Sequence, residues 1–125
     1  MKKRYEIHAI ITNKNDCFMG SGYNSYKKSH PLQKFFAERV GKPQNIYLHA
    51  EILAMIRSSI ICHKKMHTLN VSRWDKNIPL DAKPCIICIE AAIFFGIKVI
   101  NYTTKNGWVY GKTPQELKDE YSKSK

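Results

Sequence analysis

The sequence predicts an α/β fold built on a mixed sheet of five strands, within a single domain that spans residues 1–125. Segments with the apolar periodicity of strands alternate with segments that have the periodicity of helices, which is typical of this class. The dipeptide Asn106-Gly107 is a strong signal for a tight hairpin, and it lies between the last two strand segments. Because only a helical segment follows this hairpin, we expect the last strand to run antiparallel to its neighbour.

The N-terminal part of the chain predicts a hairpin followed by a less regular segment. Residues 4–12 alternate and then become continuously apolar, as a strand does, and residues 17–26 supply the returning strand after a polar turn. Gly20 and Gly22 are expected to loosen this second strand. Residues 27–45 are polar around a short apolar core, which indicates a short helix or an irregular loop.

The middle of the chain predicts two helices, two strands and a connecting loop. The second helix begins at Pro84 and ends at Gly96, and each of these residues is favoured at its position. The segments are, in order, the helix 47–65, the strand 66–74, the loop 75–83, the helix 84–96 and the strand 97–104.

The C-terminal segment predicts a short strand and a final helix. Residues 108–110 form the last strand, directly after the Asn-Gly hairpin signal. Thr113 is expected to cap the final helix, with Pro114 at its first position and Glu116 completing a capping box.

Composition excludes several classes of protein. A chain of 125 residues with 43% hydrophobic content is ordinary for a globular domain, and its apolar runs are too short to cross a bilayer. Glu6 and His8 interrupt the apolar run that a secretory signal needs, so we expect a cytoplasmic protein with no membrane partner. The net charge of +11 favours polyanions or small phosphorylated ligands, although a lysine-rich surface that only confers solubility explains this charge equally well.

The four cysteines are too few and too unevenly spaced for a disulfide scaffold. Cys17 and Cys62 are expected to be buried or partly buried thiols. Cys85 and Cys88 differ, because their spacing at the start of a predicted helix places both sulfurs on one face of its first turn. The backbone N–H groups and the positive end of the helix dipole at that turn favour thiolates, which are metal ligands.

His49 and Glu51 lie near the start of the preceding predicted helix and suggest the other half of a zinc site. Two thiolates and the His49 imidazole give Zn²⁺ three protein ligands and leave its fourth position for a water, whose pKa zinc lowers towards about 7. Glu51 lies two residues from His49, close enough to reach this water without binding the metal. We therefore expect Glu51 to act as a proton shuttle.

The order His49-x-Glu51 and then Pro84-Cys85-x-x-Cys88 resembles the signature of the zinc-dependent cytidine/deoxycytidylate deaminase superfamily. The predicted elements also follow the order of that fold over most of the chain. The resemblance implies a three-layer fold with helices on both faces of the sheet, and Zn²⁺ held by the histidine and the two cysteines, with Glu51 as the catalytic residue. It further implies hydrolytic deamination of a cytosine nucleotide and assembly as a homo-oligomer.

Substrate contacts are predicted less directly. The segment ending at Asn24 resembles the deoxycytidylate deaminase segment in which an asparagine holds the sugar, whereas an antiparallel last strand resembles the cytidine deaminase branch, so both branches stay open. Asn24 could instead be a turn residue. Arg73 and Lys28 are candidates for a phosphate, against the alternative of solvated charges, and Trp74 could stack on a base or belong to the core. The residues expected to contact substrate are Tyr23, Asn24, Lys28, Ala50, Arg73, Trp74 and Pro84.

Three alternatives remain at this stage. The charge is compatible with a deaminase that acts on cytosine, or adenine, in single-stranded DNA or RNA. It is also compatible with a zinc-containing nucleic-acid-binding module without catalysis. Finally, His63 and His67 could join Cys85 and Cys88 in a structural zinc site, which would leave Glu51 without a role.

Overall fold

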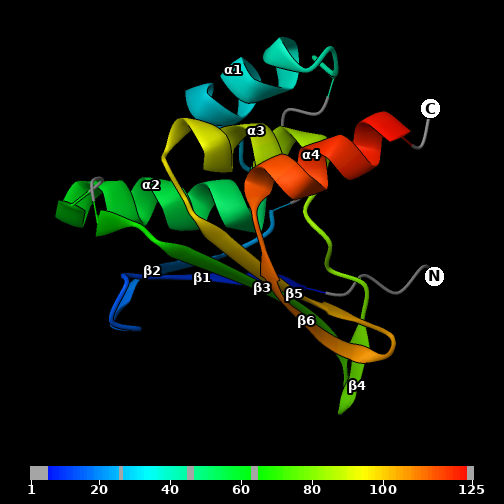
Figure 1. Cartoon of the computed structure of the whole chain (residues 1–125). Helices are drawn as coiled ribbons and strands as arrows, with labels where there is room; N and C mark the ends of the chain where they lie inside the picture. The colour runs from blue at the N-terminus through cyan, green and yellow to red at the C-terminus, as the bar shows by residue number, and fades with distance from the viewer. Residues whose placement is uncertain (1–5, 26, 45–46, 63–64, 124–125) are drawn as a thin grey trace.

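A computed structural model describes residues 6–25, 27–44, 47–62 and 65–123, apart from the side chain of residue 62. Figure 1 shows a sheet with helices stacked on it. In chain order the elements are β1 (Ile7–Thr12), β2 (Phe18–Tyr23), α1 (Pro31–Arg39), α2 (Ala50–Cys62), β3 (Thr68–Asp75), β4 (Ile78–Leu80), α3 (Ile86–Phe94), β5 (Val99–Thr104), β6 (Gly107–Lys112) and α4 (Pro114–Lys123).

The five-stranded path of the sheet confirms the predicted fold class. Its strand order is β2-β1-β3-β5-β6. β1 pairs antiparallel with both β2 and β3, and β3 pairs parallel with β5. β6 runs antiparallel to β5, as the Asn106-Gly107 hairpin predicted. Within α4, the backbone N–H of Glu116 donates to Thr113 Oγ1, and the N–H of Thr113 donates to the Glu116 carboxylate, so the predicted capping box forms.

A sixth strand is the main departure from the predicted elements. Residues 75–83 were expected to be a loop, but β4 lies within them and pairs antiparallel with the end of β3. The two strands are joined by a two-residue turn in which Lys76 has a φ of 57°. This turn lacks the glycine or Asn-Gly signature of such hairpins, and Pro79 argues against a strand, so the pattern offered no signal for it.

All four described helices lie over one face of the sheet in Figure 1, whereas the family resemblance implied helices on both faces. The covered face is apolar and fully buried along alternate positions, for example at Ala9 of β1 and at Leu69 and Val71 of β3. The opposite face includes Asn70 and Ser72, which stay partly exposed. Because that face is largely polar, it does not require a covering layer. No described helix has the length and apolar character that a membrane span needs.

α1 forms as a regular helix in the segment for which a helix or a loop was predicted, and it packs on α3 rather than on the sheet. His30 caps α1, because its Nδ1 accepts from the Leu32 N–H at 3.0 Å. The ring of Phe36 is fully buried and meets Phe94 of α3 edge to face. Cys17, which was expected to be at least partly buried, is exposed because it lies in the connection between β1 and β2, and the side chain of Cys62 lies outside the described residues.

A buried carboxylate ties the outer helices together. Glu90 of α3 accepts from Arg39 of α1 at 3.0 Å and from Lys118 of α4 at 3.2 Å. Burial alone would raise the pKa of Glu90, but the hydrogen bonds from these two cations outweigh burial and lower it. The charged form of Glu90 therefore links α1, α3 and α4.

Two glycines of β2 allow α2 to pack directly on the backbone of this strand. A Cβ at Gly22 would lie 2.8 Å from the carbonyl oxygen of Ala50 and 2.9 Å from the Leu53 Cβ, and a Cβ at Gly20 would lie 2.6 Å from Ser58 Oγ. The expectation that the glycines loosen this strand is wrong, because both lie within the regular strand β2. They fix how closely α2 approaches it.

We expect Gly22→Ala to lower the free energy of unfolding by about 1–3 kcal/mol, because the added methyl group must push α2 away from β2. Urea denaturation measures this loss. Ser21→Ala is the matched control on the same strand, since Ser21 contacts Arg57 only through its backbone carbonyl. Equal urea midpoints for Gly22→Ala and the wild type would show that α2 does not need this approach.

Candidate active site

Three predicted metal ligands meet where the N-termini of α2 and α3 face each other. His49 directly precedes α2, and its carbonyl accepts from the Leu53 N–H at 3.0 Å. Cys85 is the N-cap of α3, and its carbonyl accepts from the Ile89 N–H at 3.0 Å. Cys88 follows one turn later, so both sulfurs lie on the same side of the helix start, as their spacing predicted.

The distances among these three side chains fit a zinc ion. His49 Nδ1 lies 3.2 Å from Cys88 Sγ and 3.5 Å from Cys85 Sγ. A tetrahedral zinc with ordinary Zn–N and Zn–S bonds sets nitrogen and sulfur about 3.5 Å apart. Within the described ranges, these three residues form the only such group of metal-binding side chains. His49, Cys85 and Cys88 are thus positioned to hold Zn²⁺ with three protein ligands.

The alternative site with two histidines and two cysteines does not form around His67. Its Nδ1 lies 2.8 Å from Thr68 Oγ1, and the residue borders a separate hollow at the opposite end of the sheet. His63 lies outside the described residues.

The environment of the two sulfurs favours one thiolate even before a metal binds. The hydrogen bond from Cys88, helped by that from His49, lowers the pKa of Cys85 to about 4 although burial opposes the change. Burial raises the pKa of Cys88, and the neighbouring Cys85 thiolate adds to this effect. Cys85 therefore holds the negative charge that a cation would meet first.

Glu51 lies in the first turn of α2, beside the ligand group but outside it. Glu51 is buried, with only 5% of its surface exposed. Burial raises the pKa of the Glu51 carboxyl, and the negative charge of Cys85 raises it further. A carboxyl whose pKa is raised in this way holds a proton more readily than an exposed one, which suits a group that must both take and return a proton.

A cavity of about 470 Å³ opens in front of these residues, a size within the range of small-molecule sites. Among the predicted substrate contacts, it includes Asn24, Ala50 and Arg73. The Asn24 side chain is held at the cavity wall, because its Oδ1 accepts from the Ile7 N–H at 2.8 Å.

Four other predicted contacts do not line this cavity. Tyr23 stacks on His8, with ring centroids 4.4 Å apart, and Trp74 is 42% exposed. Successive side chains of a strand point to opposite faces, so Arg73 at the cavity leaves Trp74 on the other face of β3. Pro84 and Lys28 are also absent from the lining, and Lys28 contributes a backbone carbonyl that accepts from Leu48.

Several cavity residues were missed by the sequence analysis. They come from the connections on either side of α1 and from the segment before α3: Ser25, Gln44, Tyr47, Asp81, Ala82 and Lys83. The last three directly precede the Pro84-Cys85 motif, and this position is the signal in the sequence that could have predicted them.

Gln33 is a further missed residue, and it supports a metal ligand. It is fully buried in α1, and its Oε1 accepts from the backbone N–H of His49 at 3.1 Å. An N–H that precedes a helix has no partner within that helix, so Gln33 satisfies a group that would otherwise be buried without a hydrogen bond. The signal in the sequence was the position of this glutamine among the apolar residues of the segment 31–39, which indicates a buried polar side chain with a specific partner.

Comparisons with known proteins agree with this geometry. A family model described as the cytidine and deoxycytidylate deaminase zinc-binding region matches residues 1–104. Among solved structures, the chain is similar to a cytidine deaminase from Burkholderia pseudomallei, with a TM-score of 0.59 and 13% identity over 91% of this chain and 79% of that chain. At this identity the likeness shows the fold alone. No curated protein sequence matches the chain significantly.

We expect Gln33→Leu to weaken zinc binding about 10- to 100-fold, because His49 loses the acceptor that orients its backbone. Competition with a chelator measures the affinity. Phe36→Leu is the control, since it reduces packing of the same helix without touching a polar contact of His49. If Gln33→Leu and Phe36→Leu release zinc at the same chelator concentration, Gln33 has no specific role in orienting His49.

Proposed function

This chain belongs to the family that carries the cytidine and deoxycytidylate deaminase zinc-binding region, and we propose that it removes the ring amino group of a cytosine nucleotide such as dCMP or dCTP by hydrolysis. The observation that carries this proposal is the group of His49, Cys85 and Cys88 beside a buried Glu51, at the wall of one cavity. Two of the residues that line the same cavity, Arg73 and Lys83, are cationic, which suits a phosphorylated substrate.

In the proposed reaction, Glu51 moves the protons. His49, Cys85 and Cys88 would hold the zinc, and the chemistry it would supply is an activated water as the nucleophile. Glu51 takes a proton from this water as its oxygen bonds to the ring carbon that carries the amino group, and passes it to the adjacent ring nitrogen. A second proton, from the hydroxyl group that this carbon has gained, passes through Glu51 to the amino group; the carbon–nitrogen bond breaks, the oxygen becomes a carbonyl, and ammonia leaves. The raised pKa of Glu51 supports both the acceptance and the return of protons.

We also propose that the protein acts in the cytoplasm as a homo-oligomer. The exposed thiol of Cys17 and the thiol ligands of the metal site suit a reducing compartment. Large apolar side chains at the surface of β6, including Tyr110 at 69% exposure, are compatible with contacts between subunits.

We expect the zinc-loaded wild type to release ammonia from dCMP or dCTP, and Glu51→Gln to reduce this rate about 10²- to 10⁴-fold because the proton carrier is lost. Ammonia release is measured with dCMP, dCTP, cytidine and deoxycytidine. Zinc content should stay unchanged in Glu51→Gln, and Glu38→Gln, which removes an exposed carboxylate from α1, should keep full activity. Absence of turnover of all four compounds by the zinc-loaded wild type would refute deamination of free nucleotides.

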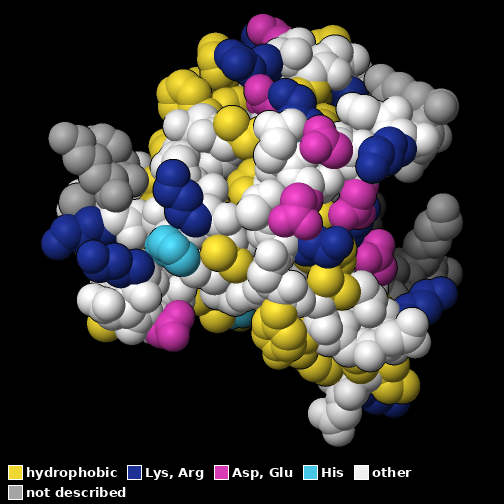
Figure 2. Space-filling model, in the orientation of Figure 1, with side chains coloured by type: hydrophobic (Ala, Val, Ile, Leu, Met, Phe, Trp, Pro, Cys, Tyr) yellow, Lys and Arg dark blue, Asp and Glu magenta, His cyan; other side chains and the backbone are white. Residues whose placement is uncertain are grey.

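A second candidate function is deamination of a base within single-stranded DNA or RNA. The net charge of +11 favours it, and basic side chains gather at the left of the view in Figure 2. Among the basic residues, Lys14, Lys65 and Lys98 border a hollow of about 340 Å³. Tyr47 lines the active-site cavity while 51% exposed, so it could stack on a base next to the target.

For this second function, we expect oligonucleotide binding that weakens steeply with salt, together with conversion of C to U in a defined single strand. Tyr47→Ala should weaken binding about 5- to 100-fold through the lost stacking. The control is Tyr110→Ala, which removes an exposed aromatic residue away from the cavity. Binding without conversion, and without turnover of any nucleotide, would favour the non-catalytic zinc module.

A further inference from the structure

We propose that Lys83 recognises the phosphate of the substrate, and that Glu120 of α4 holds its ammonium group until substrate binds. This inference rests on the proposed function, since it assigns the residue that separates nucleotides from nucleosides. It starts from the segment that joins β4 to α3, which forms one wall of the cavity through Asp81, Ala82 and Lys83 and ends at the ligand Cys85.

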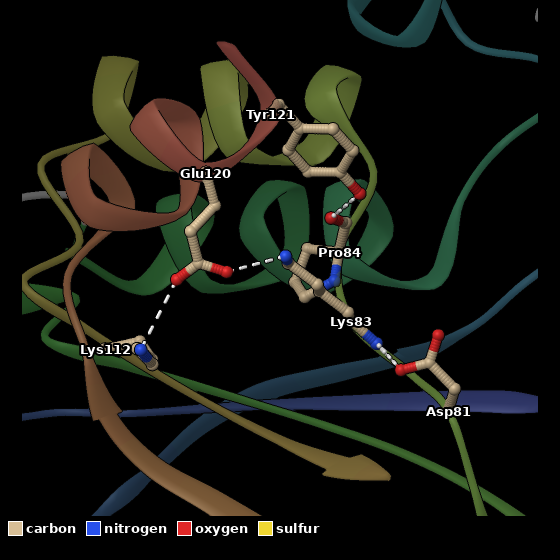
Figure 3. A network of polar contacts seen from close by, with 6 residues as sticks. All are labelled: Asp81, Lys83, Pro84, Lys112, Glu120 and Tyr121. Carbon is tan, nitrogen blue, oxygen red and sulfur yellow. Dashed lines mark hydrogen bonds and ion pairs between the residues drawn. The ribbon is translucent and has the colours of Figure 1, made fainter. Parts of the chain in front are cut away.

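The backbone of this segment is fixed on both sides. The Ala82 N–H donates to the carbonyl oxygen of Thr103 in β5 at 2.9 Å, and the Lys83 N–H donates to Asp81 Oδ1 at 3.3 Å. From α4, the Tyr121 hydroxyl donates to the Pro84 carbonyl oxygen at 2.9 Å (Figure 3). Burial, helped by the charge of Cys85, raises the pKa of Tyr121 to about 12, so its hydroxyl stays protonated and keeps donating. Lys83 therefore projects from a fixed point, two residues before Cys85.

The side chain of Lys83 is held by a contact that can be exchanged. Lys83 Nζ lies 2.7 Å from Glu120 Oε1, and 5.1 Å from the centroid of the Tyr121 ring. The side chains of Lys83 and Glu120 are 28% and 38% exposed, and ion pairs with such access to water contribute little net stability. Lysine also has a flexible four-carbon stem, so its ammonium group can turn from Glu120 towards the cavity at low cost.

A second lysine makes this exchange electrostatically possible. The other oxygen of Glu120, Oε2, lies 3.3 Å from Lys112 Nζ at the end of β6, so one carboxylate lies between two ammonium groups (Figure 3). If Lys83 turns to a phosphate, Lys112 still neutralises Glu120. Lys112 does not line the cavity, so the two lysines share one partner but only Lys83 borders the cavity.

The charges around the cavity favour a phosphate at this wall. Arg73, at the end of β3, is the other cation of the lining. Of the two acidic residues of the lining, Asp81 already accepts a hydrogen bond from the Lys83 N–H, and Glu51 belongs to α2 rather than to this wall. A phosphate dianion offers Lys83 more charge than a single carboxylate does, so its arrival displaces the contact with Glu120.

The test compares binding of dCMP and deoxycytidine, measured by calorimetry on the zinc-loaded Glu51→Gln background, which prevents turnover. Lys83→Gln should weaken dCMP binding roughly 10- to 100-fold, as for a lost hydrogen bond to a charged group, and leave deoxycytidine binding unchanged. Lys83→Arg should restore most of the difference. Glu120→Gln should strengthen dCMP binding, because the competing carboxylate charge is gone.

Lys112→Gln is the matched control, since it removes the same charge from the same carboxylate but not from the cavity. It should weaken dCMP binding less than Lys83→Gln does, because it only strengthens the hold of Glu120 on Lys83, through an exposed ion pair, and removes no contact to the phosphate. Equal losses for dCMP and deoxycytidine in Lys83→Gln, or equal losses of dCMP affinity in Lys83→Gln and Lys112→Gln, would overturn the proposal. Failure of the proposed function would instead leave the wild type without ammonia release from any cytosine compound.

Discussion

The convergence of two helix N-termini is the constraint on which the rest of this structure depends. His49 precedes α2 and Cys85 caps α3, so the metal ligands come together only if both helices cover the same face of the sheet at a fixed distance. For α2, that distance is set at Gly20 and Gly22, where a methyl group would collide with the helix. A zinc site with nitrogen and sulfur atoms 3.2 to 3.5 Å apart tolerates little displacement. The glycines of β2 therefore belong to the active site, although neither touches a ligand.

The outer helices α1 and α4 help to hold the metal ligands in place. α1 supplies Gln33, which orients His49, and α4 supplies Tyr121, which holds the residue before Cys85. Glu90 of α3 binds a cation from each of these two helices, so the supports of both metal-ligand segments are anchored on one carboxylate. This arrangement explains why a polar group is retained at the back of the core, where its ion pairs must offset the cost of burial.

The sequence was sufficient to predict whatever depended on local pattern. The alternation of strands and helices along the chain, the antiparallel β6, the capping box at Thr113 and the zinc ligands follow from periodicity, turn chemistry or the spacing of the two motifs. What could not be predicted depends on which segments meet in space. Tyr23 and Trp74 were chosen for their chemistry, but strand alternation turns Trp74 away from the cavity that Arg73 lines. Gln33 and Glu120 lie far along the chain from the residues they contact, so no local pattern linked them.

The antiparallel last strand has a consequence for substrate recognition. Because β6 returns the chain along β5, α4 starts at the end of β6 and runs back towards the segment before α3, where its last turns carry Glu120 and Tyr121. A last strand parallel to β5 would need a helix between the two strands and would not place Lys112 beside the same carboxylate. The strand direction that resembles the cytidine deaminase branch thus supplies Glu120 and Lys112, which would control the single lysine, Lys83, through which this chain would select a nucleotide. An antiparallel last strand does not exclude a phosphorylated substrate. The resemblance of the Asn24 segment to deoxycytidylate deaminases and that of the last strand to cytidine deaminases are therefore compatible within one active site.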